Sequence, residues 1–479
     1  MKTFTILIIL FFSLTCSFEL AQEKYEYTKE TDPLVLQKLQ QWQNAKFGLM
    51  MHWGPYSQWS VTESWTICSE DWIHRKSDDY NEYKIKYEGL KKTFNPTEFD
   101  PVKWAKAAKD AGMRYVVFTT KHHDGFSMFD TKQTEYKITD KECPFNSNPK
   151  ANITKEIFQA FRDEDFMIGA YFSKPDWNSN YYWWRYYATP DRNVNYDIKK
   201  YPERWQKFAE FTQNQIDELM TDYGRVDILW LDGGWVRPYS EKEIEKRRMK
   251  ADFNTFRLQS QDINIPLIVK NARIKQPGLI VVDRTVSGPY ENYLTPENRV
   301  PETVIPYPWE TCMPMARSWS YVANDNYKSS RILVHLLVDI VSKGGNFLLN
   351  IGPGPGGDFD ETAYDRLKEI GYWMKVNGEA IYNSHPVEPY KEGKVCFTQL
   401  EDGTTYAIYL ADENESRQGG MPAKLSLEKF SPLPNAEIEL LGTNIKIIWE
   451  KVDNGCELEI PESVRKNFTD EYTLIFKIK

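Results

Sequence analysis

Short apolar strands alternate with amphipathic helices over most of the first 380 residues, and no other feature constrains the fold as much. The sequence predicts strands at 115–119, 167–173, 226–231, 278–285 and 346–353. Between them it predicts helices at 101–113, 154–166, 201–224, 252–262 and 329–345. Such alternation is typical of an α/β fold with a parallel sheet.

Polar clusters at the ends of these strands favour one of two parallel-sheet folds. The strands run into KHHDG, SKPDW, DGGW, DRT and NIGPG. A (β/α)8 barrel gathers its active site at the C-terminal ends of its strands, whereas an open doubly wound sheet uses one switch point. Because clusters follow at least five strands, we predict a (β/α)8-like TIM barrel. The glycine-rich stretch 352–357 lacks a following Lys-Ser/Thr, so we interpret it as a turn and not as a phosphate site.

The last hundred residues have a different pattern. After a helix predicted at about 360–380, short runs alternate apolar and polar residues, with an Asp402-Gly403 turn between two of them. Period-two alternation with turn signals is typical of antiparallel strands. We therefore predict a barrel domain over 22–385 and a C-terminal antiparallel β-sandwich over 386–479.

The N-terminus has the layout of a secretory signal peptide. Lys2 precedes an apolar run from Phe4 to Leu14, and small and polar residues follow. The run is too short to span a bilayer, so we predict a cleaved signal at 1–21 and a secreted or periplasmic protein. An uncleaved anchor and a lipid anchor on Cys16 are the alternatives. No later stretch is apolar enough for a membrane span, and the five other cysteines form no CxxC motif, which leaves a disulfide or two open.

Composition narrows the class of ligand. The net charge is −9 and there is no long basic run, which argues against a nucleic-acid partner. Aromatic residues make up 15% of the chain. Aromatic faces suit the apolar faces of sugars, although most aromatic side chains in any protein are core. These two features favour a small-molecule or glycan ligand.

Five sequence blocks together resemble the glycoside hydrolase family 29 α-L-fucosidases. They are KFGLMMHWGPYS (46–57), TTKHHDGFSMFDT (119–131), ILWLDGGW (228–235), WETCM (309–313) and GGNFLLNIGP (344–353). They occur in the order found in that family. The resemblance implies a (β/α)8-like barrel with a C-terminal β-sandwich, exo-acting release of L-fucose from fucosylated glycans, a retaining mechanism, and neither metal nor cofactor.

Two carboxyl groups are needed for a retaining glycosidase, one as nucleophile and one as acid/base. Asp232 follows the strand 226–231 and precedes two glycines that leave room for a substrate; it matches the nucleophile of the family. The acid/base is predicted between that strand and WETCM, where Glu291 and Glu297 are both candidates. The spacing from Asp232 favours Glu291, and the YLTPE context favours Glu297. We take Glu291 as acid/base and Glu297 as the runner-up that otherwise binds substrate.

The sugar-binding residues are assigned by the resemblance. The chain has only six histidines, and three of them, His52, His122 and His123, match histidines that hold the sugar hydroxyls. The other predicted substrate-binding residues are Glu70, Trp72, Tyr171 and Arg284. In the family the Glu-Trp pair is adjacent, but here Asp71 intervenes, so Glu63 and Trp65 are the alternative pair. Trp309 and Phe347 are candidates for an apolar wall beside the C6 methyl group, with core packing equally expected.

Three other functions remain as alternatives. A metal-dependent hydrolase built on His122, His123 and Asp124 lacks a further ligand motif, because no HExxH is present and adjacent strand residues point to opposite faces. A non-catalytic fucose- or glycan-binding protein on the same fold has no need of Asp232. The third alternative is a glycosidase for α-L-galactose, a sugar that has the same ring stereochemistry as fucose.

Overall fold

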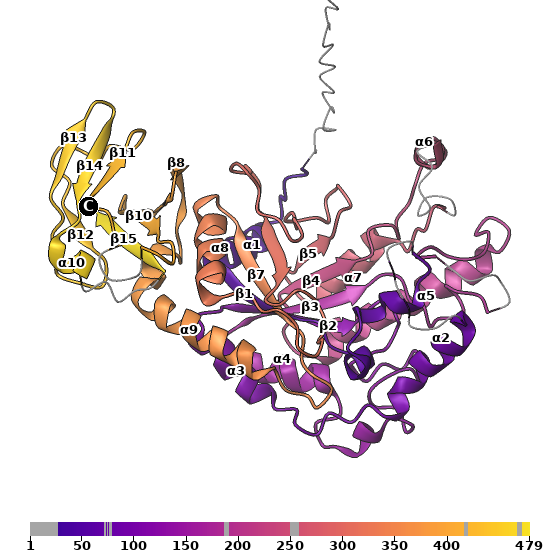
Figure 1. Cartoon of the computed structure of the whole chain (residues 1–479). Helices are drawn as coiled ribbons and strands as arrows, with labels where there is room; N and C mark the ends of the chain where they lie inside the picture. Colours follow the sequence, from indigo (N-terminus) through magenta and orange to yellow (C-terminus); the bar gives the residue numbers. More distant parts are fainter. Residues whose placement is uncertain are drawn as a thin grey trace, which may run out of the picture.

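The computed structural model describes residues 27–70, 73, 75, 79–185, 191–249, 258–415, 420–466 and 472–479 (Figure 1). The predicted signal segment 1–21, with Cys16, and the predicted sugar-binding residue Trp72 lie outside the described residues. Within them the chain forms a parallel barrel followed by antiparallel sheets, as the sequence predicts.

Seven parallel strands form the barrel sheet in the order β5-β4-β3-β2-β1-β7-β6. They are β1 (Phe47–Met51), β2 (Tyr115–Lys121), β3 (Met167–Ser173), β4 (Ile228–Asp232), β5 (Ile280–Asp283), β6 (Glu310–Pro314) and β7 (Asn346–Ile351). Nearly every residue of these strands is buried, because helices cover the outer face and side chains fill the interior. The (β/α)8-like fold class is confirmed.

An irregular segment, 290–298, occupies the position between β5 and β6. On one side Glu291 forms a bridge with Val282 of β5. On the other side Glu297 forms a parallel bridge with Cys312 of β6. The segment therefore completes the ring of strands, and it carries both candidate acid/base residues. Its backbone pairing fixes which of the two reaches the C-terminal end of the barrel.

Helices surround the barrel, and one closes its N-terminal end. Trp42 of α1 stacks on Tyr293 inside the barrel with ring centroids 3.9 Å apart, and its carbonyl accepts a hydrogen bond from Asn346 at the start of β7. The helices are α1 (Pro33–Ala45), α2 (Tyr80–Glu88), α3 (Pro101–Asp110), α4 (Ile153–Asp163), α5 (Pro202–Asp222), α6 (Glu241–Met249), α7 (Ile265–Lys275), α8 (Ser330–Ser342) and α9 (Glu361–Asn377). Short 3-10 turns at Pro55–Trp59 and Glu63–Ile67 follow β1 on the opposite, C-terminal side.

The antiparallel part begins at His385, one residue before the predicted boundary. A five-stranded sheet has the order β12-β15-β10-β9-β8, and a three-stranded sheet has the order β11-β14-β13. Their bounds, with the helix α10, are β8 (His385–Glu392), β9 (Val395–Gln399), β10 (Thr405–Leu410), β11 (Lys424–Leu427), β12 (Ile438–Leu440), β13 (Trp449–Val452), β14 (Gly455–Glu459), α10 (Glu462–Lys466) and β15 (Thr473–Ile478). The exact division into domains stays a prediction.

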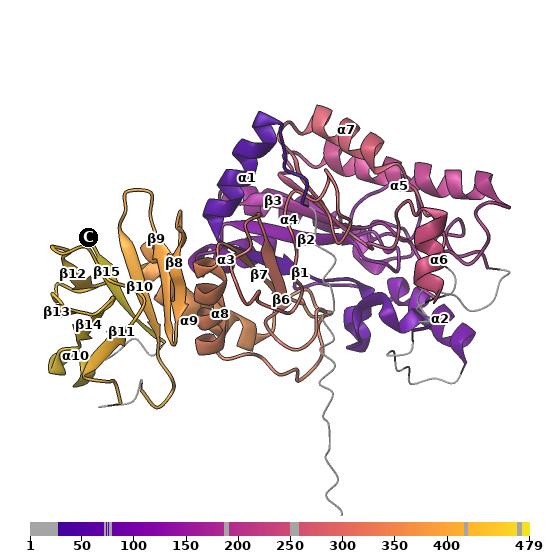
Figure 2. The ribbon, with the colours of Figure 1, turned by 90° about the horizontal axis from the view of Figure 1, so that it is seen from above.

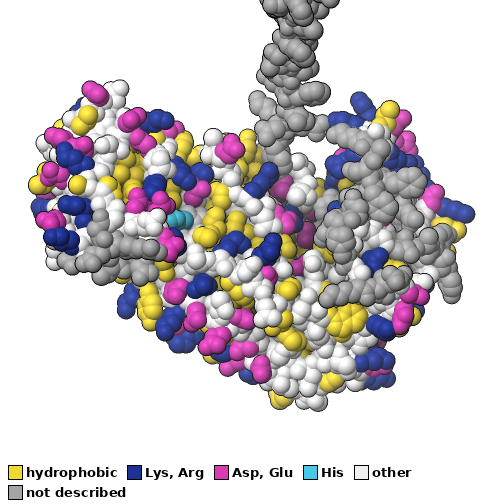
Figure 3. Space-filling model, in the orientation of Figure 1, with side chains coloured by type: hydrophobic (Ala, Val, Ile, Leu, Met, Phe, Trp, Pro, Cys, Tyr) yellow, Lys and Arg dark blue, Asp and Glu magenta, His cyan; other side chains and the backbone are white. Residues whose placement is uncertain are grey.

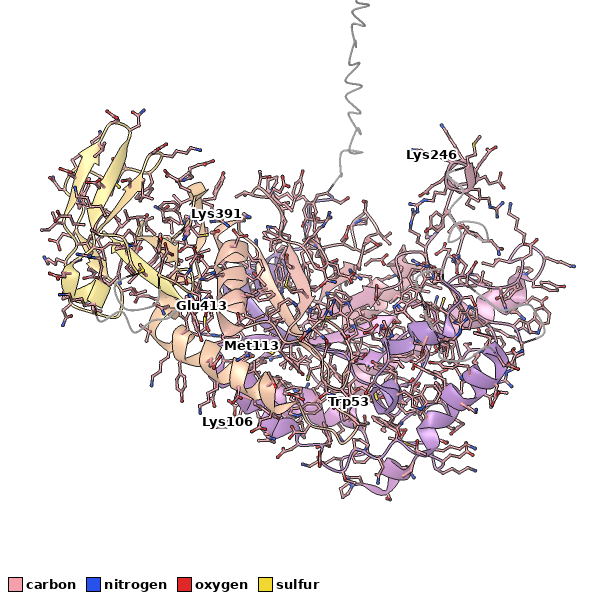
Figure 4. The ribbon with its side chains drawn as sticks, in the orientation of Figure 1. Trp53, Lys106, Met113, Lys246, Lys391 and Glu413 are labelled. Atoms are coloured by element: carbon pink, nitrogen blue, oxygen red, sulfur yellow. The ribbon has the colours of Figure 1, made fainter. Side chains whose placement is uncertain are left out.

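The five-stranded sheet packs directly on α8 and α9, on the side of the barrel away from α2 and α6 (Figures 1 and 2). Ile408 of β10 and Ile475 of β15 belong to the same apolar core as the barrel helices. Trp373 of α9 donates its indole N–H to Thr473, and Lys391 of β8, labelled in Figure 4, pairs with Asp339 of α8. The junction between the two parts is therefore a continuous apolar core with one buried hydrogen bond, from Trp373 to Thr473, and one exposed ion pair, between Lys391 and Asp339.

Several elements differ from the prediction. Strand β2 continues to Lys121, and β4 continues to Asp232, so the predicted nucleophile is the last residue of its strand. The strands β1 and β6 and the helices α1, α2, α6 and α7 were not predicted. The helix predicted at 252–262 lies partly outside the described residues, and 258–262 are not helical.

The described residues also bear on the membrane and cysteine predictions. No helix among them has the length and apolarity needed to cross a membrane. All five of their cysteines are buried and free. Over the described part of the face seen in Figure 3, basic and acidic side chains are interspersed.

Candidate active site

A cavity of about 210 Å³ opens at the C-terminal ends of the barrel strands. Its walls come from the last residues of the strands and from the loops that follow them. The lining residues are Met50, His52, Glu63, Trp65, His122, His123, Tyr171, Arg192, Trp230, Asp232, Trp235, Arg284, Glu297, Cys312 and Trp319. The cavity thus gathers seven of the ten predicted site residues from β1 to β5 and from the segment 290–298.

Asp232 is held in the ionised form a nucleophile needs. Its Oδ2 accepts a hydrogen bond from the Tyr171 hydroxyl at 2.8 Å, and its Oδ1 accepts one from the Gly233 N–H at 2.7 Å. Burial alone would raise the pKa of this carboxyl. The positive charge of Arg284, the nearby His123 and these hydrogen bonds outweigh burial and hold the pKa well below its usual range.

Arg284 connects Asp232 to a second carboxyl group. Its Nη1 lies 3.3 Å from Oδ1 of Asp232, and its Nη2 is hydrogen-bonded to Oε2 of Glu297. Burial would lower the pKa of Arg284, but the two carboxylates raise it above its ordinary value. Because β5 ends at Asp283, Arg284 is the first residue of the loop and projects over the strand ends.

Glu291 lies elsewhere, on the β5 side of the same segment. Its Oε1 accepts the Thr285 N–H at 3.0 Å, and it is not among the residues that line the cavity. Burial raises the pKa of Glu291 to about 7. That value would suit a general acid, but position decides first, because a proton donor must reach the leaving oxygen. Of the two candidates, Glu297 is the one that lines the cavity with Asp232.

His52 follows β1 and presents a defined tautomer. Its Nδ1 lies 2.8 Å from Oδ1 of Asn350 on β7, while the amide nitrogen of Asn350 donates to the Trp319 carbonyl at 2.7 Å. The amide orientation leaves only an acceptor for Nδ1, so the proton sits on Nδ1 and Nε2 is a hydrogen-bond acceptor. Burial lowers the pKa of His52 to about 4, so the ring is neutral at pH 7.

The adjacent histidines both line the cavity, because they lie just beyond the end of β2, where strict strand alternation no longer applies. Their ring centroids are 4.3 Å apart. His122 pairs through Nδ1 with the Ser64 hydroxyl, and Nε2 of His123 lies 3.7 Å from Oδ2 of Asp232. Burial lowers the pKa of both rings, that of His123 to about 4. Neutral imidazoles with free ring nitrogens suit hydrogen bonds to hydroxyl groups.

Of the two Glu-Trp pairs, Glu63 and Trp65 line the cavity. Glu63 has a positive φ of 26°, an uncommon conformation that is found at functional sites. Its Oε1 accepts the Ser320 N–H at 2.9 Å, and burial raises its pKa to about 7. Glu70 does not line the cavity; its carboxylate is paired with Arg192.

An apolar side of the cavity is formed by Met50, Trp230, Cys312 and Trp319. Trp309 and Phe347, the candidates for an apolar wall, lie instead in the core between barrel and helices and do not line the cavity. The alternative expectation, that these two residues pack in the core, therefore describes their position.

A buried carboxyl group lies beneath the cavity floor. Glu310 of β6 accepts a hydrogen bond from the Tyr115 hydroxyl at 2.7 Å and one from the Trp230 indole N–H at 3.3 Å. Burial raises the pKa of Glu310 to about 7 against the opposing effect of these donors. Since Trp230 also lines the cavity, Glu310 supports the floor from below.

His122, His123 and Asp232 offer ligand atoms within 4.8 Å of one another, so the residues of this group could contact one ion. One contact weighs against a resident cation, because Arg284 already neutralises Asp232. A guanidinium in contact with the carboxylate would repel a second cation at the same place.

Sequence reasoning did not single out Arg192, Trp235 or Trp319. Each lies in a loop beyond a strand end, and no local sequence pattern marks Arg192 or Trp319. Trp235 alone had a signal, since it closes the DGGW cluster after β4.

The chain matches known proteins over nearly its whole length. A family model described as Alpha-L-fucosidase matches residues 14–379. Plasma alpha-L-fucosidase of Rattus norvegicus is 28% identical over 442 residues, covering 87% of this chain and 86% of that protein. Plasma alpha-L-fucosidase of Homo sapiens is 26% identical over 441 residues, covering 87% and 85%.

Solved structures agree with this match. Alpha-L-fucosidase isoenzyme 1 from Paenibacillus thiaminolyticus has a TM-score of 0.73 at 27% identity, covering 93% of this chain and 99% of that one. The Thermotoga maritima alpha-fucosidase in complex with fucose has a TM-score of 0.69 at 25% identity, covering 95% and 100%. The chain therefore belongs to the α-L-fucosidase family and is a glycoside hydrolase.

Proposed function

We propose that the protein is a retaining exo-α-L-fucosidase that releases terminal α-L-fucose from oligosaccharides or glycoconjugates. One observation carries the proposal: an aspartate kept ionised and a second carboxyl group line the same small cavity and are joined by Arg284. A retaining glycosidase needs that pair of groups within reach of one anomeric carbon. The cavity volume of about 210 Å³ suits a single sugar ring, which favours exo action.

Asp232 is the proposed nucleophile. It attacks the anomeric carbon, the bond to the leaving oxygen breaks, and a covalent fucosyl ester forms. The Tyr171 hydroxyl and Arg284 hold its two oxygens, so the carboxylate is oriented before the substrate arrives.

Glu297 is the proposed acid/base, in place of Glu291. It protonates the leaving oxygen in the first step and removes a proton from the attacking water in the second, which restores both carboxyl groups. Support comes from its place in the cavity lining and its contact with Arg284, while Glu291 accepts a backbone N–H outside the lining.

The sugar hydroxyls are held by His52, His122, His123 and the pair Glu63 and Trp65 in this proposal. Neutral imidazoles can accept or donate to hydroxyl groups, and the indole N–H of a tryptophan can only donate. Met50, Trp230, Cys312 and Trp319 provide apolar contact for the C6 methyl group. An α-L-galactoside would place a hydroxyl at that apolar side without a matching partner, and therefore the fucoside is favoured.

The testing experiment combines turnover and stereochemistry. Wild-type protein is incubated with p-nitrophenyl α-L-fucoside and the matching α-L-galactoside, and the first-formed anomer is identified by proton NMR. We expect faster fucoside hydrolysis and α-L-fucose as first product. A 2-deoxy-2-fluoro-fucosyl fluoride should label the peptide that contains Asp232, detected by mass spectrometry. First-formed β-L-fucose, or a label elsewhere, would refute the retaining mechanism; fucose binding without turnover would favour the binding-protein alternative.

We also propose that residues 1–21 direct export and are removed. The proposal is supported by the Lys2 and Phe4–Leu14 pattern and by relatives whose printed name is plasma alpha-L-fucosidase. Intact-mass measurement of the exported protein tests it. A mass that includes residues 1–21, or a lipid on Cys16, would contradict cleavage at this site.

A further inference from the structure

Arg192 lines the cavity and is held by a carboxylate from below. Its Nε lies 2.7 Å from Oε1 of Glu70, and its Nη2 lies 3.1 Å from Oε2. The Glu70 side chain is fully shielded from solvent, whereas that of Arg192 is 23% exposed. A guanidinium bound through both Nε and Nη2 to one carboxylate is fixed in its plane and in its rotation.

Two indole rings fix the same guanidinium from the sides. Its central carbon lies 5.1 Å from the Trp65 ring centroid and 5.2 Å from that of Trp235. Both rings also pack against His123, at 5.2 Å and 5.3 Å between centroids. Trp65, Trp235, His123 and Arg192 therefore form one rigid wall of the cavity, which we call the Arg192 wall.

Glu70 contacts only one edge of the guanidinium. In a planar guanidinium the Nε and Nη2 hydrogens point to one side, and Nη1 projects toward another. Glu70 occupies the first side and lies outside the cavity lining, while Arg192 lies within it. Within the described part of the chain, Nη1 and the second hydrogen of Nη2 are thus left to point at a bound molecule, and the positive charge makes them strong donors.

The Arg192 wall lies on the sugar side of the nucleophile. His123, which belongs to the wall, approaches Oδ2 of Asp232, whereas Arg284 with Glu297 approaches Oδ1. The leaving oxygen must meet the acid, so it departs toward Glu297. A hydrogen-bond donor on the other side of Asp232 from Glu297, as Arg192 is, would therefore meet the ring hydroxyls.

We propose that Arg192 is a further substrate-binding residue that donates from Nη1 to a ring hydroxyl of the sugar, and that Glu70 is its positioning residue. The inference rests on the proposed fucosidase function. It also gives Glu70 a part in sugar recognition without direct contact, because its carboxylate fixes the donor that makes the contact.

The test measures L-fucose binding by calorimetry, which needs no turnover. We expect Arg192→Met to weaken L-fucose binding by about 10-fold or more, as for loss of a charged hydrogen bond. Arg192→Lys should restore little, since an ammonium cannot make the two-point contact with Glu70. Arg317→Met, on an exposed loop at the same end of the barrel, is the matched control and should bind as wild type.

Deoxy sugars identify the contact. Removing the hydroxyl that Arg192 binds should weaken wild-type binding by a similar factor and leave Arg192→Met unchanged. Glu70→Gln should weaken binding in the wild-type background but add nothing to Arg192→Met, a readout that a general loss of stability would not give. Thermal melting of each variant confirms that it is folded.

Two failures are distinguishable. If wild-type protein neither binds L-fucose nor hydrolyses the aryl fucoside, the proposed function fails and this inference falls with it. If wild type does both and Arg192→Met binds L-fucose as tightly, or if every 2-, 3- and 4-deoxy sugar loses equal affinity in both proteins, only the inference is overturned. The inference would also be overturned if Arg192→Met weakened the binding of fucosides with a large leaving group and left the binding of L-fucose unchanged. That result would place Arg192 on the leaving-group side.

Discussion

Arg284 contacts both carboxyl groups of the cavity: Nη1 lies 3.3 Å from Asp232, and Nη2 is hydrogen-bonded to Glu297. In the proposed mechanism Asp232 becomes a fucosyl ester and loses its negative charge, which leaves Glu297 as the carboxylate in contact with Arg284. One cation can thereby serve both steps of the reaction.

The two candidate glutamates should separate by mutation. We expect Glu297→Gln to lower kcat/KM by about 10²- to 10⁴-fold on an oligosaccharide, whose leaving group needs protonation, and by less on p-nitrophenyl α-L-fucoside. Glu291→Gln, the matched control six residues earlier, should stay within a few-fold of wild type on both. Azide should rescue Glu297→Gly and give α-L-fucosyl azide, because it attacks the fucosyl ester from the face that the leaving group vacated. The reverse pattern would return the acid role to Glu291.

Replacing Asp232, the proposed nucleophile, should lower the activity more than replacing Glu297. We expect Asp232→Ala to lose roughly 10⁴-fold or more in kcat, as for loss of a covalent nucleophile. Binding of L-fucose should be retained in part, because the histidines and Arg284 remain. The measurement is kcat by single-substrate kinetics together with calorimetric binding of L-fucose. Activity within about 10-fold of wild type would exclude Asp232 as nucleophile.

The buried histidines should destabilise the fold in acid. The pKa of His52 is about 4 in the fold and about 6.5 in an unfolded chain, so unfolding takes up a proton between these values. The stabilisation is complete above pH 6.5 and is lost as the pH falls toward 4, by about 1.4 kcal/mol for each pH unit. Urea unfolding of wild type and His52→Gln at pH 7, 6 and 5 measures the difference. Parallel stability curves for the two proteins would contradict the lowered pKa.

Glu310 should have the opposite dependence. Its pKa is raised to about 7 in the fold against about 4.3 unfolded, so its contribution is complete below pH 4.3 and is lost as the pH rises through 7. Glu310→Gln cannot ionise, and we expect its stability relative to wild type to increase between pH 5 and 8. Denaturant unfolding over that range tests this. A constant difference would show that Glu310 titrates normally or not at all in this range.

A chelator should leave the activity intact. The group formed by His122, His123 and Asp232 has ligand spacing, but Arg284 already occupies Asp232. We expect unchanged kcat and KM after dialysis against EDTA, with metal content checked by mass spectrometry. Loss of activity that zinc or another divalent ion restores would revive the metal-dependent alternative.

The barrel could be predicted because most of its strands have a clear sequence pattern. Runs such as 115–119 are apolar, rich in β-branched residues and followed by a polar cluster, so both their existence and their C-terminal ends could be identified. Strand β6 was not predicted because Glu310–Pro314 is short, begins with an ionisable residue that is buried in the barrel and ends in proline. Helix α7 escaped because its apolar start at Ile265 resembles a strand.

Site residues were easier to predict the closer they lie to the end of a strand. His52, His122, Asp232 and Arg284 lie at or next to strand ends, where the fold itself determines position. Glu297 depends on backbone pairing of 290–298 with β5 and β6, which no local pattern reveals. Spacing from Asp232 therefore favoured Glu291, although only Glu297 lines the cavity.

Arg192 and the Glu-Trp pair show the same limit. The sequence offers two nearly equivalent Glu-Trp pairs within 63–72, and the 3-10 turn Glu63–Ile67 places Glu63 and Trp65 at the cavity. Long loops are specified by many weak tertiary contacts, so their side chains cannot be placed from spacing alone.

The continuous core between the barrel helices and the five-stranded sheet limits how this protein can change over evolution. A sheet joined only by a linker can be exchanged for another by recombination at the linker. Here a replacement would have to offer α8 and α9 the same apolar surface that Ile408 and Ile475 provide, and a partner for Trp373. Descendants of this chain should therefore inherit both parts together, with variation concentrated at the outer edge of the C-terminal sheets.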